Sequence, residues 1–232
     1  WLACMVRTPL PWAHRVWALP VLTVLCPSER FYEPRGRRHQ TLTERAWQMM
    51  RLVVRWLPGR ELAFVADSSF AALELLDKVK TWPRASVSPR WRLDAALDDP
   101  SPPREPGPKG RPRLKGQRRP TLAAVLEDEK THWTALIVEQ WYGEGPREVE
   151  VATDTAVWYH AGKPPVAIRW VLIRDPKKAF DPQALLSTHP AHTPAQMLPW
   201  FVRRWTLEVT FEEARAPLGM ATQRPGNDRA SA

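Results

Sequence analysis

Short apolar runs open the chain and predict a pair of strands. Residues 1–9 and 16–26 are rich in large and β-branched apolar side chains, which is typical of strands. Leu10-Pro11 lies between them and indicates a turn. Because the connection is short, we expect the two strands to pair antiparallel.

The next apolar pattern predicts a helix over residues 42–57. Apolar side chains recur there every three or four positions, so one face of the helix is expected to be buried. Thr41 or Thr43 can cap the first turn. Pro58-Gly59 ends the helix.

A largely apolar run over residues 61–67 ends in a carboxylate. Its continuity predicts a central strand that is covered on both faces. Ser69 can cap a following helix over residues 70–81. Asp67 is then expected at the carboxyl end of a strand, where α/β folds place their ligands. The alternative is that Asp67 belongs only to the helix cap, and the local sequence leaves both interpretations open.

Two stretches of the chain are strongly basic. Residues 28–41 predict a loop whose charged centre includes Arg35, Arg37 and Arg38. Residues 100–120 carry seven basic residues against one acid, with dense proline and glycine, and cannot build a core. We expect an exposed, mobile loop there and favour a phosphate-contacting arm over a solvated linker. Of the seven, the six that we assign to this arm are Lys109, Arg111, Arg113, Lys115, Arg118 and Arg119.

Strand patterns return over residues 131–174. Three runs separated by glycine- and proline-containing turns predict a three-stranded antiparallel unit. Its aromatic side chains can stack on bases, but packing in a core or across strands is the interpretation we favour. These aromatic residues are Trp133, Trp141, Trp158, Tyr159 and Trp170. Shorter elements are a strand within residues 85–97, a helix over 121–126 and a strand over 184–188.

The last apolar pattern predicts one helix over residues 194–216. Thr193-Pro194 supplies a cap and a first-turn proline. At 100° per residue, an aromatic side chain, two arginines and a carboxylate fall within an arc of about 60°. These residues are Phe201, Arg204, Glu208 and Arg215. A carboxylate flanked by arginines on a half-buried face is suited to holding a metal ion against a phosphate.

Composition favours an anionic partner. The chain of 232 residues has a formal net charge of +9 and a pI of about 10.1, which points to nucleic acid first and a membrane surface second. Cys4 and Cys26 lack a metal-binding spacing and predict buried thiols in a reducing compartment. No apolar run is long enough to predict a transmembrane helix.

Two of these stretches resemble the bacterial insertion-sequence DDE transposases. The helix with Phe201, Arg204, Glu208 and Arg215 is similar to the signature helix of that family, in which Phe201 is usually Tyr and Arg215 usually Lys. The resemblance makes Phe201 and Trp205 supporting aromatic residues. The run that ends in Asp67, followed by serine and a leucine-rich helix, resembles the strand that carries the second catalytic Asp.

The resemblance implies an α/β fold. It is a ribonuclease H-like domain with its first strand absent and with an antiparallel β-rich insertion. The separation of Asp67 from Glu208, 141 positions, fits the subgroup that carries such an insertion. The expected parts are a core over residues 1–98 and 183–220, a basic loop with the insertion over 99–182, and an irregular tail over 221–232.

The implied activity is metal-dependent cleavage and strand transfer of double-stranded DNA at transposon ends. The family uses three carboxylates to hold two Mg²⁺ ions, for which Mn²⁺ can substitute. The resemblance assigns Asp67 and Glu208 to catalysis and metal binding. It implies that Arg204 and Arg215 bind phosphate near Glu208 or steady the Glu208 carboxylate. For Arg215, pairing with an acid along the helix is an equal alternative. The resemblance further implies a homodimer in the full-length protein, in the bacterial cytoplasm at the nucleoid, without a membrane partner.

The first catalytic Asp of the family has no counterpart in this sequence. In the family it lies on the first strand of the fold, whereas residues 1–26 resemble the second and third strands. Asp154 and Asp175 come after Asp67 and within the predicted insertion, so we reject them as substitutes. We therefore expect a transposase piece cut at both ends, which does not cleave DNA by itself.

Three other functions stay open. The first is a non-catalytic DNA-binding remnant of a transposase that uses the same basic loops. The second is another ribonuclease H-like nuclease such as a resolvase, which the β-rich residues 131–174 disfavour. The third is a membrane-surface protein, which ranks last because we expect no basic amphipathic helix with an exposed aromatic face.

Overall fold

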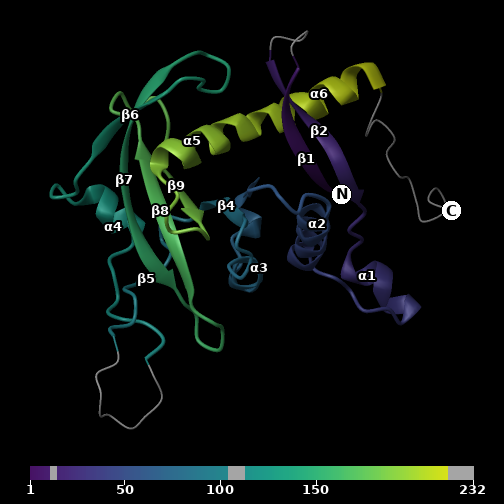
Figure 1. Cartoon of the computed structure of the whole chain (residues 1–232), viewed down its shortest axis with the longest axis horizontal. Coiled ribbons are helices and arrows are strands. Elements are labelled where there is room, and N and C mark those ends of the chain that lie inside the picture. The colour runs from purple at the N-terminus through teal and green to yellow at the C-terminus, as the bar shows by residue number, and fades with distance from the viewer. Residues whose placement is uncertain (11–14, 104–112, 219–232) are drawn as a thin grey trace. The chain divides into compact units, whose positions relative to one another are not determined.

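The computed structural model describes residues 1–10, 15–103 and 113–218, and these form a mixed α/β protein (Figure 1). The chain divides into two compact units. Unit 1 combines Trp1–Leu25 with the chain from Arg204 onward, and unit 2 is Cys26–Arg203.

Unit 1 is built on a two-stranded hairpin. Strands β1 (Leu2–Leu10) and β2 (Arg15–Val24) pair antiparallel along their whole length, which confirms the first prediction. The register shifts by one residue between Cys4 and Met5, as at a β-bulge. Helix α6 (Thr206–Leu218) packs against β2.

Unit 2 contains a seven-stranded, mostly antiparallel sheet. Its strands are β3 (Leu62–Ala66), β4 (Ala85–Trp91), β5 (Leu97–Asp98), β6 (Thr134–Val138), β7 (Arg147–Trp158), β8 (Val166–Arg174) and β9 (Gln183–Ser187). Their order is β3-β4-β9-β8-β7-β5, with β6 also pairing with β7. Strands β6, β7 and β8 confirm the predicted antiparallel unit, and they continue through β9 and β4 into one sheet.

Short helices connect and cover these strands. They are α1 (Glu29–Tyr32), η2 (Glu33–Arg35), α2 (Leu42–Trp56), η3 (Ser68–Phe70), α3 (Leu73–Val79), α4 (Leu122–Glu127) and α5 (Pro194–Val202). Helix α2 begins as predicted, because the Thr41 side chain accepts a hydrogen bond from the Glu44 N–H and Glu44 reaches back to the Thr41 N–H. The prediction of a loop over residues 28–41 was incomplete, since α1 and η2 lie within it.

Strand β3 differs from its prediction. In the described part of the chain it is the end strand of the sheet, and none of its residues is buried. A continuous apolar run reports a tendency to be buried, but strand order depends on pairing with distant segments. The expectation of a central, doubly covered strand was therefore wrong. Its pairing with β4 is parallel, unlike every other strand pair described.

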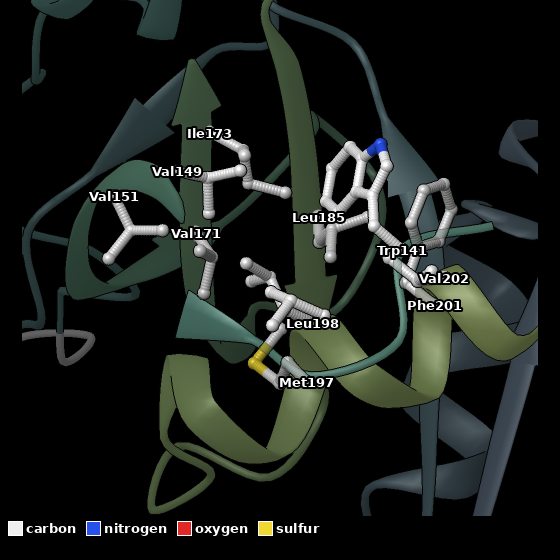
Figure 2. Close-up of a cluster of buried hydrophobic side chains, with 11 residues drawn as sticks. Trp141, Val149, Val151, Val171, Ile173, Leu185, Met197, Leu198, Phe201 and Val202 are labelled. Carbon is white, nitrogen blue, oxygen red and sulfur yellow. The ribbon is translucent and has the colours of Figure 1, made fainter. Parts of the chain in front are cut away.

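The core of unit 2 lies between α5 and the sheet. Met197 and Leu198 of α5 are almost completely buried against side chains of β7, β8 and β9, such as Val149, Val171 and Leu185 (Figure 2). Contact between these large side chains explains why one face of α5 is apolar.

Most of the predicted aromatic residues have structural roles. Trp141 and Trp170 are 6% exposed, which confirms core packing for both. Trp158 lies edge-on against Trp91. The guanidinium of Arg174 lies over the ring of Trp133 at 3.9 Å, so this ring is engaged within the protein.

Among the helices of the described ranges, none combines the length and the apolar composition required to cross a bilayer.

Candidate functional site

Asp67 lies at the carboxyl end of the parallel β3–β4 pair. It follows Ala66, which pairs with Pro89 of β4, and its side chain is exposed. It also precedes η3, but its side chain makes no capping hydrogen bond there, and α3 begins only at Leu73. Asp67 thus takes the N-cap position of η3 without a side-chain cap, and the predicted helix over 70–81 begins later than expected. The position of Asp67 at this edge is the one at which α/β sheets place ligands.

Glu208 lies in the first turn of α6 and forms an ion pair with Arg204. The distance from Arg204 Nη1 to Glu208 Oε1 is 3.2 Å, and the side chains are 19% and 56% exposed. The positive end of the helix dipole favours a carboxylate in this turn. The half-buried arginine thus holds a carboxylate that still faces solvent. This arrangement fits the predicted role of Arg204 in steadying Glu208.

The helix that carries Glu208 is not the single helix expected over residues 194–216. Helix α5 ends at Val202, and the 3₁₀ turn η4 (Arg203–Trp205) separates it from α6. Phe201 and Glu208 belong to different units, so the common arc predicted for them stays a prediction. The break falls where the chain passes from unit 2 to unit 1.

The two aromatic residues predicted to support the site, Phe201 and Trp205, belong to different units. Phe201 is 5% exposed and belongs to the core cluster of α5. Trp205 is 37% exposed in η4. The side chain of Arg215 lies outside the part that the structure describes, so its predicted phosphate contact stays a prediction.

Asp67 and Glu208 fit a magnesium ion in chemical type, because Mg²⁺ prefers carboxylate oxygens. They belong to different units, so their sharing of one metal site stays a prediction. Within residues 1–10, 15–103 and 113–218, no group of three or more His, Cys, Asp or Glu side chains is placed to hold a metal ion.

Most described residues of the predicted basic arm are anchored to the protein. Lys115 Nζ lies 2.8 Å from the completely buried carboxylate of Asp98, and Arg118 Nη1 lies 3.6 Å from it. Arg119 forms ion pairs with Asp99 and Asp154. The prediction of a mobile arm was therefore wrong for these three residues, because acids at β5 and β7 hold them.

The backbone of the same segment is also fixed. Gly116 N–H donates to Asp99 O at 2.8 Å, and Arg119 N–H donates to Leu97 O at 2.9 Å. A Cβ on Gly116 would lie 2.6 Å from Pro100 O, so the close approach of the two chain segments requires glycine. Arg113 is exposed, while Lys109 and Arg111 lie outside the described residues.

Two of the three arginines at the predicted charged centre of residues 28–41, the basic segment before α2, also interact with other residues of the chain. Arg35 donates to Phe31 O at 2.7 Å and its guanidinium lies over the Phe31 ring. Arg38 forms an ion pair with Glu44. Arg37 is exposed, and its predicted contact with phosphate stays a prediction.

The structure supports the rejection of Asp154 and Asp175 as catalytic residues. Asp154 is bound by Arg119. The side chain of Asp175 is 1% exposed and accepts hydrogen bonds from Arg147 and from the N–H groups of Lys177 and Ala179. Both carboxylates are thus occupied by partners of the chain itself.

The surroundings of Asp175 predict a pH dependence of stability. The Lys177 N–H above all, and also the Ala179 N–H and Arg147, lower the pKa of Asp175 in the folded protein. The folded state therefore gains stability that is fully present above the unfolded pKa, about 3.9, and is lost as the pH falls through the lowered folded pKa. Acid titration of wild type and Asp175→Asn, monitored by the free energy of unfolding, is expected to give a shallower decline for the variant in this window. Asp181→Asn, at an exposed position, is the control, and equal slopes for all three proteins would contradict the prediction.

One polar cluster was missed in the sequence. Ser187 Oγ lies 2.9 Å from His192 Nδ1, and the ring of His192 stacks on that of His189. Burial and the neighbouring His189 lower the pKa of His192, against the opposing effect of Glu61. Ser187 is completely buried and its Oγ also accepts from the His189 N–H, so the cluster fixes the turn between β9 and α5. The presence of one serine and two histidines within residues 187–192 is the sequence feature from which this cluster could have been predicted.

No protein-family model matches the chain, and no curated protein sequence matches it either.

Proposed function

We propose that the chain is a piece of a DDE-type DNA transposase with a ribonuclease H-like fold. In this proposal β3 and β4 are the parallel strands of that fold, and the antiparallel strands β6 to β8 are its insertion. Asp67 and Glu208 are two of the catalytic carboxylates. Double-stranded DNA is the substrate.

One observation carries the proposal. The parallel pair β3–β4 ends in an exposed Asp67, while the remaining strand pairs described in the sheet are antiparallel. A carboxylate at the carboxyl end of a parallel pair is well placed for a ligand. Glu208 on α6, which forms an ion pair with Arg204, is the second carboxylate of the proposal.

The chemistry proposed for the site needs Mg²⁺. When bound between carboxylates, such an ion activates a water or hydroxyl nucleophile and stabilises the leaving oxygen. Asp67 and Glu208 would supply oxygen ligands, and Arg204 would hold Glu208 in position. With no third carboxylate assigned in this sequence, we expect the chain by itself not to cleave DNA.

Metal-directed cleavage of the polypeptide tests the shared site. Bound Fe²⁺, with ascorbate and peroxide, produces hydroxyl radicals that cut the backbone near the metal. We expect cuts near residues 67 and 208 that excess Mg²⁺ suppresses. Asp67→Asn is expected to remove both sets of cuts, and Asp154→Asn, a matched change at a carboxylate bound by Arg119, is expected to keep them.

The outcomes separate the two candidate functions. Cuts at only one segment, or cuts that survive in Asp67→Asn, would contradict a shared metal site. Absence of localised cuts together with DNA binding would favour the alternative, a non-catalytic DNA-binding remnant. Nicking of transposon-end DNA with Mg²⁺ or Mn²⁺ that Glu208→Gln abolishes would overturn the expectation that the chain is inactive alone.

A further inference from the structure

The exposed face of α2 carries a row of arginines. Residues 42–60 contain four arginines and one glutamate. The buried residues of α2 are Ala46, Met49, Met50 and Val53. On a helical projection Arg51 and Arg55 lie within about 40° of each other and roughly opposite this buried arc. Both side chains are exposed.

The carboxylates of α2 and of the adjacent α3 already form ion pairs with other residues. Glu44, on the same helix, forms an ion pair with Arg38. On the adjacent α3, Glu74 pairs with Lys163 and Asp77 with Lys80. In the described part of the chain, no carboxylate forms a salt bridge with Arg51 or Arg55. Two like charges four residues apart oppose helix formation when nothing neutralises them.

Neighbouring groups extend the positive charge. Arg51 lies over the ring of Trp47 at 5.0 Å, and Lys78 of α3 lies over the same ring at 4.8 Å. Arg60, just after the helix, is exposed too. We name Arg51, Arg55, Arg60 and Lys78 the α2 basic face. Lys78 also lies near the carboxylates of Glu44 and Glu74. Arg51, Arg55 and Arg60 are exposed to solvent, which favours an external anion over an internal role.

We infer that the α2 basic face binds the phosphate backbone of duplex DNA. Arg51 and Arg55 are separated by about 6 Å along the helix axis, and a duplex presents a phosphate charge about every 1.7 Å of its axis. Cations at this spacing can therefore contact phosphates simultaneously. The inference shares with the proposed function the expectation that DNA is the partner, but it concerns α2 and not the metal site.

An anionic membrane is the competing partner for such a face. Trp56 is 53% exposed and Leu52 is 37% exposed, so α2 does have the exposed aromatic and basic character that was not expected from the sequence. However, the continuous apolar arc of α2 is buried within the protein and cannot insert between lipids. Leu52 and Trp56 by themselves offer a smaller apolar surface than this buried arc, so the charge of the face favours nucleic acid.

Binding of a labelled duplex of mixed sequence tests the inference. The double variant Arg51→Gln/Arg55→Gln keeps helix-forming side chains and removes two positive charges. We expect its affinity at low salt to fall at least about tenfold, and the slope of log K against log salt to lessen by about 1.8. The control Lys130→Gln/Lys177→Gln removes the same charge from exposed residues outside α2 and is expected to keep the wild-type slope.

The outcomes distinguish this inference from the proposed function. If wild type does not bind the duplex, DNA binding fails as a whole, and both proposals fail with it. If wild type binds and the α2 variant matches the control, the α2 inference alone is overturned. Loss of binding to phosphatidylserine vesicles in the α2 variant, with unchanged DNA affinity, would assign the face to membranes instead. Equal unfolding midpoints for the variants exclude misfolding as the cause.

Discussion

Replacing Leu198 by alanine is expected to lower the free energy of unfolding of unit 2 by about 2–5 kcal/mol. Leu198 of α5 is completely buried in the cluster that joins the helix to β7, β8 and β9 (Figure 2). Truncation removes apolar contacts and leaves a cavity that the surrounding sheet cannot fill. Urea unfolding followed by tryptophan fluorescence should show a lower midpoint with an unchanged slope.

The matched control is an exposed apolar residue of the same sheet. Ile137 on β6 is 61% exposed, and Ile137→Thr keeps a β-branched side chain there. A surface change of this kind is expected to alter stability by no more than about 0.5 kcal/mol. Similar losses for Leu198→Ala and Ile137→Thr would show that α5 does not anchor the core as described.

The second large effect is expected at Lys115. Its ammonium group donates to Asp98, whose carboxylate is completely buried. Lys115→Met leaves that carboxylate with Arg118 alone, 3.6 Å away. Breaking a buried ion pair costs about 3–5 kcal/mol, and because the Lys115 side chain is 36% exposed we expect a smaller loss of roughly 2 kcal/mol.

A double variant separates the ion pair from other effects. Adding Asp98→Asn to Lys115→Met removes the buried charge, so we expect more than half of the lost stability to return. Lys130→Met, the same change at an exposed lysine, should be close to neutral. If the double variant were as unstable as the sum of the single ones, the ion pair would not be the source of the loss.

These effects bear on how the basic residues are tested for DNA binding. Lys115, Arg118 and Arg119 hold the segment after residue 112 to the sheet through Asp98, Asp99 and Asp154. Changes at these residues would reduce DNA binding through instability alone. Arg51, Arg55 and Arg37 are exposed, and their substitution tests phosphate contact more directly.

The sequence by itself determined most of the local structure. Periodicity placed the β1–β2 pair, α2 with its Thr41 cap, and the three antiparallel strands β6 to β8. It succeeded because burial of one face and satisfaction of the first backbone N–H groups depend on residues close together in the chain.

Only the tertiary structure decided which elements are neighbours and which charges are occupied. Nothing in the run that precedes Asp67 reveals that β3 ends the sheet, since strand order depends on pairing across long sequence separations. Nor does the composition of residues 100–120 reveal that Asp98 and Asp154 bind its cations. Helix α5 packs on one sheet and α6 on β2, and the 3₁₀ turn lies between them, because packing partners far away in the sequence differ for the two helices.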